Sequence, residues 1–280
     1  MYNNLTNFVI KIYSYMVIKE SVIKNALRKT IKEFIEEDRI EHNDGSVEID
    51  NFKIVYEQLS FGNDNDTLYF VQIVKRDKDN PGQKSQFYAA QYLKEYYFKS
   101  LDEFKSKENE IKQLCQSLNA RAYIYMNPRS EKIVNKWTKI NLQRMEKHRD
   151  MKYKFQGNAK ALAAGRSFDD ITRPICFIDV DSNDENDIKQ VMNIIKQANI
   201  KPLFTYRSLN NGIHIVLPNK EDAKKLDFTS INGDLSKYSK RVQMNAKVGV
   251  EIDKPCILYA KLIPQGYQKQ QNRFNKWTKN

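Results

Sequence analysis

Apolar residues follow two kinds of spacing along this chain, and the two kinds alternate. Where apolar residues recur every three or four positions, the spacing predicts amphipathic helices. The expected helices cover 21–37, 100–119, a stretch around 133–140, 184–199 and 220–226. Between them, runs rich in β-branched and aromatic residues predict strands. The expected strands cover 46–61, 66–76, 120–130, 175–181, 202–208, 212–218, 248–253 and 256–260.

Turn-forming residues indicate how three pairs of these strands connect. The segment "GNDND" at 62–66 predicts a hairpin between the strands before and after it. Asn211 and Gly212 predict a second hairpin, because both residues allow a tight turn. The strands 248–253 and 256–260 are expected to form a further pair. This order of strands, helices and hairpins favours an α+β fold in which helices cover one face of a sheet.

Length and composition are compatible with one large domain or two smaller ones. The chain has 280 residues, of which 40% are hydrophobic, and this is enough for a substantial core. Small and basic residues make 153–168 the best candidate for a linker, with a short helix as the alternative. We therefore expect a helical packing segment at 1–50, an α/β subdomain at 51–150 and a second subdomain at 151–280, with 51–280 forming one domain.

The charge of the chain indicates an anionic partner. The formal net charge is +12, which favours binding to nucleic acid or nucleotides. The three cysteines are scattered without a CxxC pair, so the sequence indicates neither a zinc module nor a disulfide framework, and we expect a reducing, cytoplasmic location. Charged residues interrupt the apolar N-terminal stretch, which predicts a packing surface and no association with a membrane.

Two carboxylates end an apolar strand in the stretch "ICFIDVDSN" at 175–183. Asp179 and Asp181 are two positions apart, so in a strand they lie on the same face. Like charges repel at this distance, whereas a hard cation such as Mg²⁺ binds carboxylates together with substrate phosphates. An isolated pair of this kind is more often a solvated strand end, so the metal hypothesis depends on further residues.

Residues of matching chemistry occur on two later strands. Asp253 ends the run "VGVEID", with Glu251 two positions earlier, and these carboxylates can join the same site. The alternative is that they pair with lysines. The hairpin "YRSLNNGIHIVLP" brings His214 near Arg207 and Ser208, whose side chains are donors that a triphosphate requires. For a single histidine the alternative is a structural role.

Three of these stretches together resemble the motifs of a known family. "FIDVD", "NGIH" and "VEID" occur in this order and resemble the three motifs of the archaeo-eukaryotic primase superfamily. The upstream "YIYMNPRS" and the downstream "PCILYAKLIPQGYQ" are similar to segments of the prim-pol enzymes of phages and plasmids, so the resemblance covers 120–268. The arginine expected near the third motif is absent, and Lys254 and Lys261 are the nearest cations.

The resemblance implies an RRM-like catalytic sheet at 151–280, joined to an N-terminal α/β unit. It also implies template-directed synthesis of DNA or RNA primers from nucleoside triphosphates. Carried over to this chain, Asp179, Asp181 and Asp253 would hold two Mg²⁺ or Mn²⁺ ions, and His214 would contact the phosphates of the incoming nucleotide. The other residues expected to bind the nucleotide are Arg129, Arg207, Ser208, Asn211 and Gly212.

A polymerase-like site also requires a basic path for a single-stranded DNA template. The residues expected to contact nucleic acid are Lys237, Lys240, Arg241, Arg273 and Trp277. We expect a helicase or another replication protein as partner, and a phage or plasmid origin would place the enzyme in the host cytoplasm. The alternatives are another metal-dependent nuclease or nucleotidyltransferase, a catalytically silent nucleic-acid-binding relative of the primases, and a basic interaction module.

Overall fold

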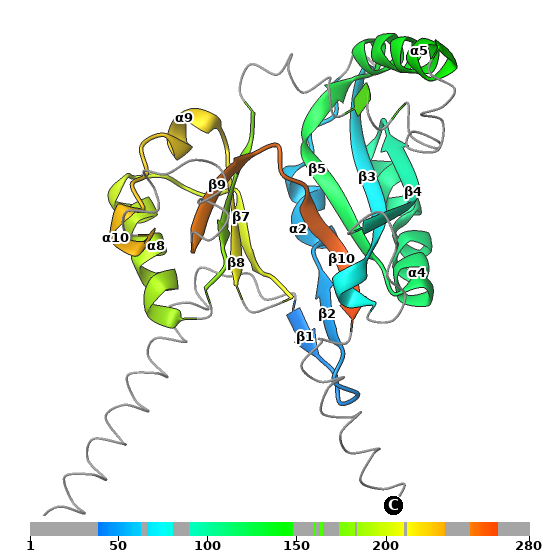
Figure 1. Ribbon diagram of the computed structural model, residues 1–280. Coiled ribbons are helices and arrows are strands. Elements are labelled where there is room, and N and C mark those ends of the chain that lie inside the picture. Colours follow the sequence, from blue (N-terminus) through cyan, green and yellow to red (C-terminus); the bar gives the residue numbers. More distant parts are fainter. Residues whose placement is uncertain are drawn as a thin grey trace, which may run out of the picture.

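Two antiparallel sheets and several helices form a mixed α+β structure (Figure 1). This confirms the α+β class expected from the sequence. The computed structural model of the protein describes residues 39–62, 66–80, 90–147, 160, 163–164, 174–182, 184–209, 212–232 and 247–262. The predicted helix 21–37 and most of the predicted linker 153–168 lie outside these residues. In the described part of the chain, no helix is long and apolar enough to cross a membrane.

The larger sheet has six strands and takes them from both ends of the described chain. Its strands, in spatial order, are β1 (Arg39–Glu41), β2 (Val47–Asp50), β10 (Cys256–Leu262), β5 (Arg121–Ser130), β3 (Thr67–Arg76) and β4 (Ala90–Phe98). Four helices and a 3-10 turn accompany it: α2 (Phe52–Gln58), η1 (Asp77–Asp79), α3 (Leu101–Ser106), α4 (Glu108–Leu118) and α5 (Glu131–Lys147). Helix α4 packs on β10, β5 and β3, where Ile111 and Cys115 are fully buried.

The smaller sheet has four strands in the order β7 (Phe204–Arg207), β8 (Ile213–Leu217), β6 (Cys176–Val180) and β9 (Val248–Ile252). Its helices are α8 (Glu185–Gln197), α9 (Lys220–Ala223) and α10 (Thr229–Asn232). Side chains alternate between the two faces of a strand. Cys176, Ile178 and Val180 therefore share one face, where they pack with α8 in a common core.

The opposite face of the smaller sheet joins the core of the larger sheet. Phe177, Tyr206 and Val216 belong to the same buried cluster as Ile257 and Leu258 of β10. The smaller sheet thus lies between α8 and the larger sheet (Figure 1). Because Asp179 is two residues from Phe177, its side chain lies on the face that is turned toward the larger sheet.

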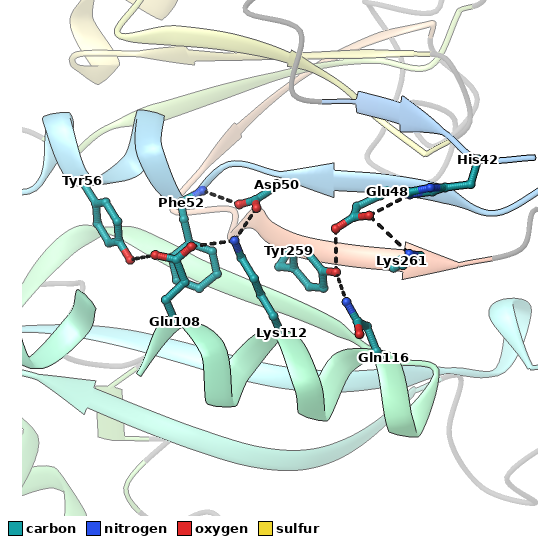
Figure 2. A network of polar contacts seen from close by, with 10 residues as sticks. All are labelled: His42, Glu48, Asp50, Phe52, Tyr56, Glu108, Lys112, Gln116, Tyr259 and Lys261. Atoms are coloured by element: carbon teal, nitrogen blue, oxygen red, sulfur yellow. Dashed lines mark hydrogen bonds and ion pairs between the residues drawn. The ribbon is translucent and has the colours of Figure 1, made fainter. Parts of the chain in front are cut away.

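A polar network fixes α4 to the larger sheet (Figure 2). Lys112 of α4 forms ion pairs with Asp50 at the end of β2 and with Glu108, whose Oε1 lies 2.6 Å from the ammonium. The hydroxyl of Tyr259 on β10 accepts a hydrogen bond from Gln116 of α4 and donates one to Glu48 of β2. The network therefore connects strands that lie more than two hundred positions apart along the chain.

Several elements lie where the sequence predicts them. Ser100 caps the helix that follows it, because its hydroxyl accepts a hydrogen bond from the Glu103 amide, and this helix continues as α3 and α4. It ends at Asn119 in a left-handed conformation with φ 49°. Strand β5, strand β6, helix α8 and the hairpin of β7 and β8 also form within the expected segments. Helix α5 covers the expected stretch around 133–140 and extends beyond it at both ends.

The prediction of a single strand over 46–61 is wrong. Only Val47–Asp50 is a strand, and after Asn51 the chain forms helix α2. Phe52 and Val55 are three positions apart and are both buried, and this spacing places them on one side of a helix. The expected hairpin across 62–66 is therefore wrong as well, and β3 pairs with β4 and β5 instead.

The prediction that 248–253 and 256–260 pair with each other is also wrong. Strand β9 pairs with β6, whereas β10 pairs with β5 and β2 in the other sheet. The direction of the chain changes at Asp253, which has a φ of 56° in the left-handed region. The larger sheet consequently contains strands from all three of the segments 1–50, 51–150 and 151–280.

Candidate functional site

The candidate site begins with two residues that face each other across neighbouring strands. Asp179 on β6 lies directly opposite His214 on β8. The Oδ1 atom of Asp179 is 3.1 Å from Nε2 of His214, and both side chains are mostly buried, with 15% and 12% of their surface exposed. The two groups are close enough for an ion pair, but they are not aligned for a hydrogen bond, so Oδ1 is buried without one.

Tyr206 fixes the orientation of His214 from the other side of the imidazole ring. Its hydroxyl lies 2.8 Å from Nδ1 of His214 and accepts a hydrogen bond of 3.0 Å from the amide of Ile257. Complete burial raises the pKa of Tyr206, so its hydroxyl keeps the proton. When this hydroxyl donates its hydrogen bond to Nδ1, the neutral ring carries its own proton on Nε2, the nitrogen that faces Asp179.

A lysine from the turn after β9 completes the surroundings of Asp179. The ammonium of Lys254 forms ion pairs with Oδ2 of Asp179 and, at 2.9 Å, with Oε1 of Glu251. Burial alone would raise the pKa of Asp179, but His214 and Lys254 hold it well below its usual value. The carboxylate is therefore ionised at neutral pH, and it already has a cationic partner.

Asp253 points to a different set of partners, all from β5. Its carboxylate accepts hydrogen bonds from Arg129, at 2.5 Å, and from the side-chain amide of Asn127, at 2.9 Å. The Arg129 side chain is fully buried and also donates to the carbonyl oxygens of Ala164 and Asn127. Burial raises the pKa of Asp253, and the Arg129 charge opposes this increase. Arg129, expected to bind the nucleotide, thus acts here as the partner of a buried carboxylate.

The remaining described residues of the predicted site form the rim of the smaller sheet. Asp181 is exposed, and its amide donates a hydrogen bond of 2.8 Å to the carbonyl of Lys247. Ser208 and Gly212 close the hairpin of β7 and β8, because the Ser208 amide donates to the Gly212 carbonyl at 2.7 Å. Arg207 ends β7 directly before this turn.

Other predicted residues fall outside the part of the chain that the structure describes. These are the nucleotide-binding candidate Asn211 and the nucleic-acid-binding candidates Lys237, Lys240, Arg241, Arg273 and Trp277.

The fit of a divalent cation depends on the carboxylates near Asp179. Among the described residues, no group of three or more His, Cys, Asp and Glu side chains is placed to hold a metal ion. Asp179 and Glu251 nevertheless share one cation, the Lys254 ammonium, and Oδ1 of Asp179 is buried without a hydrogen bond. Carboxylate oxygens are the ligands that Mg²⁺ and Mn²⁺ prefer, so this pair of residues fits such an ion. Asp253 would have to leave Arg129 to join it.

Three residues that matter in this site were not predicted for these roles: Tyr206, Asn127 and Lys254. The hairpin gives a signal for Tyr206, because its register places this residue opposite His214. For Asn127, the signal is a polar residue within the apolar strand "YIYMNPRS". Its Oδ1 atom also accepts a hydrogen bond of 2.6 Å from the amide of Ile175. For Lys254, the sequence gives only its position next to Asp253.

Comparison of this chain with models of protein families, with curated proteins and with solved structures finds no match.

Proposed function

We propose that this chain is a metal-dependent primase-polymerase, which synthesises DNA or RNA primers on a single-stranded template from nucleoside triphosphates. The observation that carries the proposal is that β8 and β9 flank β6, with Asp179 opposite His214. The three motif-bearing segments thereby lie on adjacent strands. The order β6, α8, β7, β8, α9 and α10, β9 is also compatible with an RRM-like sheet of four antiparallel strands.

The proposed chemistry assigns a role to each group of the site. Bound Mg²⁺ or Mn²⁺ would stabilise the leaving pyrophosphate and lower the pKa of the attacking hydroxyl. Asp179 and Asp181 would hold these ions, together with Glu251, which shares the Lys254 ammonium with Asp179. Asp253 is the third aspartate ligand that the motifs imply. His214, oriented by Tyr206, donates its Nε2–H to a phosphate of the nucleotide, while Arg207 and Ser208 bind the same triphosphate.

The wider setting of the proposal follows from charge and from the motifs. A net charge of +12 supports binding to a single-stranded template. In this proposal the template follows the basic residues named for the C-terminal half, and a helicase or another replication protein supplies the single strand. The enzyme works in the cytoplasm of a cell that carries a phage or plasmid.

One observation favours a second candidate, a catalytically silent relative that binds nucleic acid. Asp179 pairs with Lys254 and Asp253 pairs with Arg129, so both carboxylates already have permanent positive charges beside them. Such pairs can preserve the fold of an inherited site without any metal. A silent relative retains affinity for single-stranded DNA but forms no product.

The test is a primer-synthesis assay with purified protein. The reaction contains a single-stranded DNA template, Mg²⁺ or Mn²⁺, and labelled ribonucleotides or deoxynucleotides, and the products are separated on a gel. Short products are expected from the wild type and from the control Asp102→Ala, which changes an exposed carboxylate of α3. The double variant Asp179→Ala, Asp181→Ala should synthesise nothing, because it lacks the cation ligands.

The outcomes separate the candidates. Wild-type protein that is folded but makes no product with any template and either metal contradicts the primase-polymerase proposal. If that protein binds single-stranded DNA with an affinity that falls steeply with salt, the silent relative is favoured. Loss of labelled template in the absence of nucleotides identifies a nuclease.

A further inference from the structure

The ammonium of Lys254 lies between two carboxylates, one on each of two adjacent strands. It contacts Asp179 of β6 and Glu251 of β9, and 24% of its side-chain surface is exposed. We infer that Lys254 is an internal counter-ion, which holds Asp179 and Glu251 until a divalent cation binds and then moves to the triphosphate of the nucleotide. This inference rests on the proposed function and adds Lys254 to its site as a residue that binds the nucleotide.

The pairing of β6 with β9 explains why one cation can reach both carboxylates. Phe177 lies opposite Glu251 and Asp179 lies opposite Gly249, so Asp179 and Glu251 are diagonal neighbours on one face. Gly249 has no side chain to separate them. Two ionised carboxylates at this spacing repel each other, and a positive charge between them removes the repulsion.

The turn after β9 keeps Lys254 at this position. Asp253 adopts a left-handed conformation, with φ 56°, and its carboxylate is anchored on β5 by Arg129 and Asn127. The backbone of the next residue, Lys254, is therefore held in a fixed position. Lysine suits the role of a movable counter-ion, because its ammonium is a compact charge on a flexible four-carbon stem.

Charge determines what happens to Lys254 when a divalent cation binds. A cation that uses Asp179 and Glu251 as ligands repels the ammonium between them. Lys254 must then release both carboxylates. The triphosphate that His214 binds beside Asp179 is the nearest new anion, and an ammonium binds phosphate well as a point charge. Lys254 thus competes with the cation but assists the nucleotide.

Two binding measurements test these opposite effects without any turnover. Binding of Mn²⁺ alone is measured by the electron paramagnetic resonance of the free ion, and binding of a non-hydrolysable triphosphate is measured at saturating Mn²⁺. We expect Lys254→Met to bind Mn²⁺ about tenfold more tightly, because a competing charge at close range is gone, and to bind the triphosphate about tenfold more weakly. Lys254→Arg, which keeps the charge, should bind Mn²⁺ as weakly as the wild type.

Control variants separate this inference from the proposed function. Lys225→Met removes an exposed lysine of the segment after α9 and should change neither affinity. Asp179→Asn should lose Mn²⁺ binding. If Asp179→Asn binds Mn²⁺ as tightly as the wild type, the metal site of the proposed function is wrong. If Asp179→Asn loses binding but Lys254→Met binds Mn²⁺ no more tightly than the wild type, the proposed function stands and the role of Lys254 is refuted. Thermal unfolding establishes that each variant is folded.

Discussion

At the scale of single residues, the ion pair of Arg129 and Asp253 connects the two sheets. Arg129 belongs to β5 of the larger sheet, and Asp253 follows β9 of the smaller one. Both are mostly or fully buried, with 0% and 10% of the side-chain surface exposed. Buried charges of this kind are stable only when they are paired, because the loss of one partner leaves the other without compensation.

Arg129→Met should therefore destabilise the protein by about 3–5 kcal/mol, since it leaves the Asp253 carboxylate buried without its charged partner. Adding Asp253→Asn should recover part of this loss, because the uncompensated charge is then absent. Urea unfolding at neutral pH measures both effects. The control is Lys224→Met, which breaks an exposed pair with Glu221 and should leave the unfolding midpoint unchanged. A loss in Arg129→Met no larger than in this control would contradict the structural role of the pair.

The single residues of the site also show how much of it the sequence alone predicts. The motifs predict Asp179, Asp181, Asp253 and His214 as one group, and the structure places Asp179 beside His214. They do not predict that Asp253 pairs with Arg129, because this contact joins residues 124 positions apart in sequence. Long-range partners of this kind follow from how the two sheets meet, which the local pattern does not encode.

At the scale of elements, the pairing of β6 with β8 determines whether Asp179 and His214 meet. Gly212 directly precedes β8, and a Cβ atom at this position would lie 2.3 Å from the carbonyl oxygen of Val180. No real side chain fits at that distance, so the two strands can pair here only through glycine. The turn residue predicted from the sequence is thus also a requirement of the strand pairing.

Gly212→Ala should destabilise the protein by about 1–3 kcal/mol, because the added methyl group forces β8 away from β6. Moving β8 also separates His214 from Asp179, so affinity for a nucleoside triphosphate should fall. Gly249→Ala is the matched control for stability on the other neighbour of β6, where an added Cβ atom meets nothing within 4 Å. Urea unfolding of both variants, and triphosphate binding by Gly212→Ala and by the wild type, give the answer. Equal stability of the two variants would contradict this explanation.

The errors of prediction at this scale have a common cause. Segment 46–61 carries enough apolar residues to fit either a strand or a helix, and its helical part is decided by the burial of Phe52 and Val55 in the core. Strands β9 and β10 are neighbours in sequence but find partners in different sheets. Elements with strong local signals, such as α8 with its cap at Asp184, are predicted well because their ends depend on nearby residues.

At the scale of the whole molecule, β10 closes the larger sheet between β2 and β5. Its Tyr259 and Lys261 both contact Glu48 of β2, and α4 lies across the same strands (Figure 2). Strand β10 follows directly after the turn of Asp253 and Lys254. The network in Figure 2 therefore stabilises β10, the strand that directly follows these two site residues.

Low pH should weaken the polar network that joins β2, β10 and α4. Burial alone would raise the pKa of Glu48 and of Glu108, but Tyr259, His42 and Lys261 lower the first below its usual 4.5, and Lys112 and Tyr56 lower the second. A carboxyl group with a lowered pKa in the folded state contributes stability that is fully present above its unfolded pKa and is lost as the pH falls through its folded pKa. The contribution of both residues should therefore begin to decrease as the pH falls below about 4.5, and it should be lost once the pH is below their folded pKa.

The double variant Glu48→Gln, Glu108→Gln tests this contribution. At pH 7 it should be less stable than the wild type by about 1–3 kcal/mol, because charge-assisted hydrogen bonds are lost. As the pH falls from about 4.5 through the folded pKa of the two residues, the two proteins should become similar, since the wild-type carboxyl groups are then protonated too. Urea unfolding followed by circular dichroism from pH 7 to pH 3 measures both curves. Glu57→Gln, which changes an exposed glutamate of α2, should follow the wild type at every pH. A difference between the double variant and the wild type that stays constant over this range would mean that the network contributes nothing through the charges of Glu48 and Glu108.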